Sequence, residues 1–176
     1  MQNYIADPLS TAKIRQIALS LREVLEYDNS NRKEFPILPF LELVMPKVIE
    51  DFTICILPKE EMNNIHGLAC PEENCIKIRE DVYEGAINNN GRDRFTLAHE
   101  LGHYLLHGKS HVHLARMEKD KQIEPFRDPE WQANTFAAEL LMPINLIDTD
   151  NPFKIAREFK VSLKAAQIRA KKIYKH

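Results

Sequence analysis

The chain has 176 residues, a net charge of −2, 44% hydrophobic and 28% charged residues, which is an ordinary composition for a soluble globular protein. This length predicts one domain with its own hydrophobic core. No run approaches the ~18 apolar residues that span a bilayer, and residues 1–10 lack the apolar core of a secretory signal. We therefore expect a cytoplasmic protein with reduced cysteines and no membrane contact.

Residues 1–50 are predicted to form an N-terminal helical segment. Apolar residues recur at helical spacing over residues 11–27, directly after Ser10, which is a good N-cap. A second, shorter apolar helix is expected at residues 40–49, and Pro46 must start, kink or interrupt it.

Short strands follow. Residues 52–57 are rich in β-branched side chains and end at Pro58, and a further strand is expected around residues 65–68. Residues 75–79 alternate apolar and basic side chains, as a half-exposed strand does. We expect an α+β fold with a small mixed or antiparallel sheet.

Cys70 and Cys75 flank a predicted turn between two of these strands. Two thiols at this spacing could hold a metal ion, but the remaining ligands of a structural site are not evident nearby. We therefore favour two ordinary thiols at the ends of a turn.

A central helix is predicted after the loop at residues 88–91, with Asp93 as its cap and Gly108 at its end. Its sequence is apolar on most sides, so we expect it in the core. Gly102 lies in its interior, where glycine costs roughly 1 kcal/mol relative to alanine. This cost suggests that another element packs closely there.

The same helix carries His99, Glu100 and His103 in an H-E-x-x-H arrangement. Two histidines four residues apart project from one face of a helix and can bind a single zinc ion. Glu100 can then contact a water on that metal and act as a general base. The pattern is short, so its context has to decide between a site and chance.

Residues 109–127 are polar and irregular, and we expect a loop or flap there. A helix should then begin at Asp128 and Pro129 and stop at Met142. The C-terminal segment, residues 152–176, is predicted to hold two short helices, about 152–160 and 162–174. It contains eight lysines and arginines and one acidic residue. A solvated helix face explains this charge more simply than a nucleic-acid surface.

A catalytic zinc site usually has three protein ligands and a water. The metzincin extension requires histidine where this chain has Lys109, so a carboxylate from the second helix is the alternative. Glu130 and Glu139 are nine residues apart and point to opposite sides. Glu130 shares its face with small alanines and with Asn134, which can hydrogen-bond a ligand from behind. We choose Glu130 and interpret Glu139 as a surface or salt-bridge residue.

Two weaker hypotheses remain open. The histidines and glutamates could form a buried polar network without metal, although their desolvation makes this costly. His107 could be an extra ligand or a transition-state donor, but a histidine in the last turn of a helix is also favourable with the helix dipole. The candidate transition-state donors are Tyr104, His107, His111 and His113.

With these residues in place, the chain resembles the ImmA/IrrE family of zinc metallopeptidases over about residues 50–172. The matching motifs are residues 94–107 and 130–143, and the tail is similar over residues 155–169. The resemblance implies a gluzincin-like zincin core, here residues 51–143, with a sheet edge beside the active-site helix. It implies that zinc is held by His99, His103 and Glu130, and that Glu100 is the general base.

The resemblance also implies a protein substrate, a helix-turn-helix transcriptional repressor. The predicted activity is that of a zinc-dependent metalloendopeptidase, in which an extended substrate pairs with one strand of the sheet. The residues expected to provide that edge are Ile76, Lys77, Ile78 and Arg79. One alternative is a non-proteolytic, zinc-containing regulatory protein that binds a repressor or antitoxin. A third hypothesis is DNA binding through the basic C-terminal helices.

Overall fold

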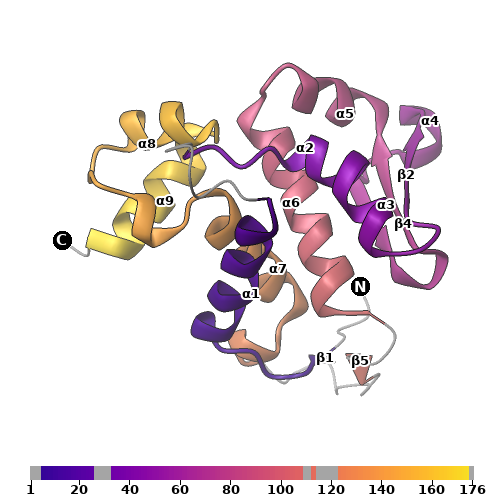
Figure 1. Cartoon of the computed structure of the whole chain (residues 1–176), viewed down its shortest axis with the longest axis horizontal. Helices are drawn as coiled ribbons and strands as arrows, with labels where there is room; N and C mark the ends of the chain where they lie inside the picture. Colours follow the sequence, from indigo (N-terminus) through magenta and orange to yellow (C-terminus); the bar gives the residue numbers. More distant parts are fainter. Residues whose placement is uncertain (1–4, 26–32, 109–111, 114–122, 175–176) are drawn as a thin grey trace.

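A long helix, α6 (Gly91–Leu106), runs through the middle of the molecule, with a sheet on one side and further helices on the other (Figure 1). The computed structural model describes residues 5–25, 33–108, 112–113 and 123–174. Asn90 caps α6, because its side chain accepts hydrogen bonds from the N–H groups of Arg92 and Asp93. The prediction that Asp93 is the cap is wrong, since the helix starts two residues before it.

The main sheet has three strands in the order β2-β4-β3. Their bounds are β2 Thr53–Leu57, β3 Gly67–Cys70 and β4 Cys75–Arg79. β2 is parallel to β4, and β3 is antiparallel to it. The predicted mixed α+β fold is confirmed.

The central position of β4 corrects one prediction about the site. Ile76, Lys77, Ile78 and Arg79 cannot form a free edge, because β4 is paired on both sides. The strand is also not half-exposed: Ile76 and Ile78 are fully buried in the core, and Arg79 on the opposite face is only 6% exposed. Arg79 is covered because it donates hydrogen bonds to the Asp81 carboxylate and to the carbonyl of Asn63.

The connections between these strands are short. A four-residue helix follows β2, a 3-10 turn joins β3 to β4, and a helix then leads from β4 towards α6. These elements are α4 Lys59–Met62, η3 Pro71–Glu73 and α5 Glu80–Ile87. The tight η3 turn ends at Asn74, whose left-handed conformation (φ 48°) allows the chain to reverse directly into β4.

The N-terminal helix, α1 (Thr11–Val24), is capped by the Ser10 side chain as predicted and packs on α7. The apolar segment that follows is divided into α2 Ile37–Pro39, a π-helix η2 Phe40–Val44 and α3 Met45–Val48. Pro46 lies in the first turn of α3, where its missing N–H is tolerated. The π-helical widening just before it, closed by the hydrogen bond from Met45 N to Phe40 O, accommodates the proline.

The second helical layer is built by the last third of the chain, drawn in orange and yellow in Figure 1. Its elements are η4 Pro125–Arg127, α7 Pro129–Leu141, η5 Ile144–Leu146, α8 Pro152–Phe159 and α9 Leu163–Tyr174. The predicted cap of α7 is confirmed, because Asp128 accepts a hydrogen bond from Glu130 N. A separate two-stranded pairing joins β1 (Ile5–Ala6) to β5 (Val112–His113).

α6 and α7 approach each other closely at Gly102. A Cβ atom added there would lie 3.0 Å from Phe136 Cδ1 and 3.2 Å from Ala133 Cα. The close packing predicted at this glycine is therefore confirmed, and α7 is the element that packs there. One hydrophobic cluster contains buried residues from the N-terminal, central and C-terminal parts of the chain. Among the described residues, no helix combines the length and apolarity required to cross a membrane.

Candidate active site

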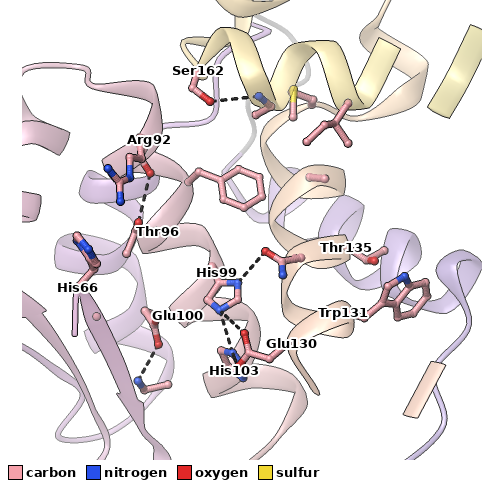
Figure 2. A pocket seen from close by; sticks show the side chains of 18 of the residues that line it. His66, Arg92, Thr96, His99, Glu100, His103, Glu130, Trp131, Thr135 and Ser162 are labelled. Atoms are coloured by element: carbon pink, nitrogen blue, oxygen red, sulfur yellow. Dashed lines mark hydrogen bonds and ion pairs between the residues drawn. The ribbon is translucent and has the colours of Figure 1, made fainter. Parts of the chain in front are cut away.

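Three polar side chains converge between α6 and α7. His99 and His103 project from one face of α6, and Glu130 reaches them from the first turn of α7 (Figure 2). The two Nε2 atoms are 3.0 Å apart. Glu130 Oε2 lies 3.4 Å from His99 Nε2, and Glu130 Oε1 lies 3.3 Å from His103 Nε2.

These separations match those of a metal coordination sphere. Ligand atoms placed tetrahedrally ~2.0–2.1 Å from a metal ion lie about 3.3 Å from one another. The three side chains therefore lie near three corners of such a tetrahedron, with each histidine closest to a different oxygen of Glu130. They form a candidate metal centre without any rearrangement of α6 or α7.

A hydrogen bond to the ring nitrogen that points away from Glu130 determines which nitrogen of His99 carries the proton. Nδ1 of His99 is 3.2 Å from Oδ1, the side-chain amide oxygen of Asn134, which lies one turn beyond Glu130 on α7. Because Asn134 Oδ1 can only accept, Nδ1 of His99 carries the proton. The Nε2 lone pair of the neutral ring is then directed at Glu130 and His103.

His103 is oriented by a longer series of hydrogen bonds. The Gln132 amide donates to the carbonyls of Asp7 and Phe126, so its Oε1 must accept, and His107 Nε2 donates to it at 2.9 Å. In neutral His107 the other nitrogen, Nδ1, is then an acceptor, and it lies 3.0 Å from His103 Nδ1. His103 Nδ1 is therefore the donor of that pair, and the lone pair of its Nε2 faces the site.

The atoms of His99, His103 and Glu130 that face one another are therefore all hydrogen-bond acceptors, and none of them carries a proton. Burial lowers the pKa of His99, and burial together with the neighbouring His99 and His107 lowers the pKa of His103 to about 3. Both rings are neutral at neutral pH, and their lone pairs face each other and the Glu130 carboxylate. Such an arrangement is repulsive by itself and is stabilised by a cation among the three groups.

Glu100 lies beside this group, on the side that faces the sheet (Figure 2). Its Oε2 accepts a 3.0 Å hydrogen bond from the backbone N–H of Ala69 in β3. Its side chain crosses Gly67 so closely that a Cβ atom on that residue would lie 2.6 Å from Glu100 Cγ. Glycine at position 67 is therefore required for the carboxylate to reach its position.

The pKa of Glu100 is raised to about 7, chiefly by burial and also by the negative charge of Glu130, against the hydrogen bond from Ala69. This value belongs to the metal-free site. A dication among His99, His103 and Glu130 would favour the ionised carboxylate and lower that pKa.

The site opens into a cavity of about 1200 Å³ between β3, α6, α7 and α9. One wall is the outer side of β3, the strand at the edge of the sheet nearest the site. The opposite wall includes the C-terminal helix. The lining residues beyond the metal centre include His66, Arg92, Trp131, Lys164 and Lys172.

The proposed transition-state donors are dispersed. Tyr104 is 7% exposed and packs edge-on against Phe52, and it is not among the residues that line the cavity. His107 lines the cavity, but its ring contacts His103 and Gln132. The backbone of His113 belongs to β5, whereas His111 lies outside the described residues.

The rejected ligand Glu139 is 1% exposed and so is not a surface residue. It accepts two hydrogen bonds from Arg169 and two from Arg15. The prediction that Glu139 is a salt-bridge residue is therefore confirmed.

Several functional contacts were not predicted from the sequence. Gln132 was missed although a buried glutamine on an apolar helix is a recognisable signal, because its partners come from residues distant in the chain. His66 was missed because it lies in a bend just before β3, where no periodic pattern marks it. The participation of α9 in the cavity wall had no local signal at all.

Comparisons with known proteins identify the family of the chain. The search of curated proteins finds no match. The family model of the IrrE N-terminal-like domain matches residues 53–171, which is most of the chain and contains both α6 and α7. The resemblance stated above is thereby confirmed: the chain belongs to the peptidase M78 family, defined by the IrrE N-terminal-like domain.

Proposed function

We propose that this protein is a zinc-dependent metalloendopeptidase in which His99, His103 and Glu130 hold the metal and Glu100 is the general base. The observation that carries the proposal is the convergence of two neutral imidazole lone pairs and one carboxylate at 3.0–3.4 Å from one another. Membership of a peptidase family supports it independently.

The donor set favours zinc. Two imidazole nitrogens and one carboxylate oxygen are the ligands of a common class of catalytic zinc sites, which leave the fourth position open. A zinc ion held there supplies a Lewis acid that polarises the scissile carbonyl and lowers the pKa of water. The open side of the three ligands faces the cavity, so a peptide could reach that position.

Glu100 has the position and environment of a general base. One carboxylate oxygen, Oε2, is fixed by the Ala69 N–H, and we assign Oε1 to accept the proton of the attacking water. The same oxygen then passes the proton to the leaving amine, so that Glu100 acts as base and acid in turn. Its burial excludes bulk water from this transfer.

The substrate is proposed to bind along β3 rather than β4. β3 is at the edge of the sheet, and its outer side, through Gly67, Leu68 and Ala69, lines the same cavity as the metal ligands. An extended peptide that adds to this edge by main-chain hydrogen bonds would pass directly over the site. The resemblance to the ImmA/IrrE family suggests a helix-turn-helix repressor in the cytoplasm as the protein that supplies this peptide.

The C-terminal helices support the enzyme over the DNA-binding hypothesis. Of the basic residues counted above, Lys154, Lys160 and Arg169 form ion pairs with carboxylates of this chain. Lys164 and Lys172 line the cavity. These two lysines thus line the cavity in which the substrate is proposed to bind, and their charge favours acidic side chains on the peptide.

The test combines metal analysis with cleavage of a repressor encoded beside this protein. The native protein should contain zinc and cleave the repressor, and Glu100→Gln should retain zinc while the rate falls by about 10²–10⁴-fold. Glu124→Gln, a change at an exposed glutamate just before α7, is the matched control and should cleave normally. Undiminished cleavage by Glu100→Gln would remove Glu100 from the mechanism.

The alternative is a regulatory protein that binds its partner without cleaving it. Zinc content would then be unchanged, and the repressor would co-purify intact with both the native protein and Glu100→Gln. Stable capture of uncleaved repressor by Glu100→Gln alone, with product release by the native protein, would instead support the peptidase.

A further inference from the structure

All three cysteines of the chain converge on one face of the sheet, away from the proposed active site. Cys70 in β3 lies directly opposite Cys75 in β4. On the other side of β4, Cys55 in β2 is paired with Lys77, two residues from Cys75. Paired residues and residues two apart in a strand project from the same face, so the three thiols share it.

A carboxylate completes the group. Glu73, in the η3 turn between Cys70 and Cys75, has its Oε2 3.9 Å from Cys75 Sγ. Ligand atoms of Cys70, Glu73 and Cys75 all lie within 4.8 Å of one another. The Cys55 thiol, in turn, is a hydrogen-bond partner of Cys75.

We propose that this cluster is a second metal site, in which the thiolates of Cys70 and Cys75 and the carboxylate of Glu73 bind a thiophilic divalent cation such as Zn²⁺, with Cys55 as the fourth ligand. Four residues separate Cys70 from Cys75, which is within the usual spacing of paired zinc-binding cysteines. Tetrahedral ligands at ~2.3 Å from zinc lie about 3.8 Å apart. Cys70, Glu73 and Cys75 therefore need only small side-chain movements, whereas the Cys55 thiol, which is outside that 4.8 Å group, has to move closer.

The surroundings favour metal binding over thiol chemistry. Cys75 is only 3% exposed, so its free thiol is poorly accessible to a reactant from solution. A disulfide between Cys70 and Cys75 would also leave Glu73 without a function in the cluster. Lys77 forms a 2.8 Å ion pair with Glu73 and would offset the excess negative charge of three thiolates and a carboxylate around a dication.

The two sites are on opposite faces of the sheet. Ile76 alternates with Cys75 and is fully buried in the core, on the face that α6 covers. A metal at the cysteine face would bind the η3 turn and all three strands to one another. It would therefore stabilise the strand that we propose as the substrate edge, without contact with His99 or His103.

The experiment uses the full-length His99→Ala/His103→Ala protein, reduced and freed of metal, so that only the second site remains. Titration with Co²⁺ should give thiolate-to-metal charge-transfer absorption that saturates at about one ion per chain. Cys70→Ser and Glu73→Gln in this background should each weaken binding at least tenfold. Glu72→Gln, a change at the adjacent glutamate of the same turn, is the matched control and should bind normally.

The native protein should bind about two Co²⁺ ions, one with thiolate absorption and one without. Each variant is first shown to be folded by circular dichroism and to present its full number of free thiols. A folded His99→Ala/His103→Ala protein with three free thiols and no thiolate absorption would overturn the proposal. Rapid loss of two thiols to a disulfide, with no metal uptake by the reduced protein, would assign the cluster to redox chemistry and overturn it equally. Neither result would bear on cleavage by the native protein.

Discussion

Two glutamates on α7 carry the same charge into different environments. Glu139 has no exposed side-chain surface and is held by Arg15 and Arg169, each through two hydrogen bonds of 2.8–3.2 Å. Glu130 has a side chain that is 68% exposed and faces two neutral imidazoles. Glu139 finds its countercharge within the protein, whereas the groups around Glu130 supply none.

The difference shows how one helix can have both a structural and a functional carboxylate. A buried glutamate with two guanidinium partners has no capacity left for a ligand. An exposed glutamate at the helix N-terminus that faces two neutral imidazoles remains available to bind a cation from outside. The position of the positive charge, rather than burial of the carboxylate, separates the two roles.

The largest effect is expected from truncating the two glutamates in turn. Glu139→Ala should lower the free energy of unfolding by about 3–5 kcal/mol, because Arg169 remains buried without its partner. Glu130→Ala should change it by less than about 0.5 kcal/mol in the metal-free protein, since this side chain is exposed. Urea unfolding in the presence of a chelator measures both. Equal losses for the two variants would contradict the comparison.

A smaller effect is expected from the residue behind His99. Asn134→Ala should weaken zinc binding by about 10–100-fold, because the ring loses the acceptor that fixes its tautomer. Competition with a chromogenic chelator measures the affinity. The unfolding curve of metal-free Asn134→Ala should match that of the native protein. A matched loss of stability would mean that Asn134 acts on the fold instead.

The pH dependence of stability should report the ion pairs of Glu139. Burial alone would raise the pKa of Glu139, but hydrogen bonds and charge from Arg169 and Arg15 lower it below its usual value. Its contribution is therefore complete above the unfolded-state pKa of about 4.3 and is lost as the pH falls through the lower folded-state pKa. Acid unfolding followed by circular dichroism should show this loss in the native protein and a flatter profile in Glu139→Gln. Identical acid profiles for the native protein and Glu139→Gln would contradict this assignment.

The smallest effect is expected from a lysine on α9, the helix whose Arg169 binds Glu139. Lys172 Nζ lies 6.0 Å from the centroid of the Trp131 ring at the cavity wall, whereas Arg169 on the same helix binds Glu139. Lys172→Ala should change stability by less than about 1 kcal/mol. It should raise the KM for an acidic peptide at low salt and leave kcat unchanged. A KM that is independent of salt in both proteins would exclude electrostatic steering by this lysine.

Much of the site could be predicted because its signals are local. The spacing of His99 and His103 on a helix, and the cap that starts α7 just before Glu130, depend on residues next to one another in the chain. Helical periodicity then decides which of the two glutamates faces α6. The cap of α6 was wrongly assigned to Asp93 because two good capping residues occur within three positions.

The other errors concern contacts between distant segments. The alternation in β4 resembles a half-exposed strand, but Arg79 is covered by Asp81 and the Asn63 carbonyl, and the neighbouring strands come from both sides. The thiol cluster could not be predicted either, because the parallel pairing of β2 with β4 brings Cys55 to Cys75 across 20 positions of sequence. No local pattern contains that information.

The series of hydrogen bonds that begins at the Asp7 carbonyl connects the N-terminal segment to the proposed metal centre. Gln132 is oriented by that carbonyl, and through it His107 and His103 acquire their proton positions. A chain that began after residue 10 would keep every proposed ligand and still lose one of the two carbonyls that orient Gln132. Loss of the first ten residues should therefore weaken zinc binding only in part, because the Phe126 carbonyl still orients Gln132.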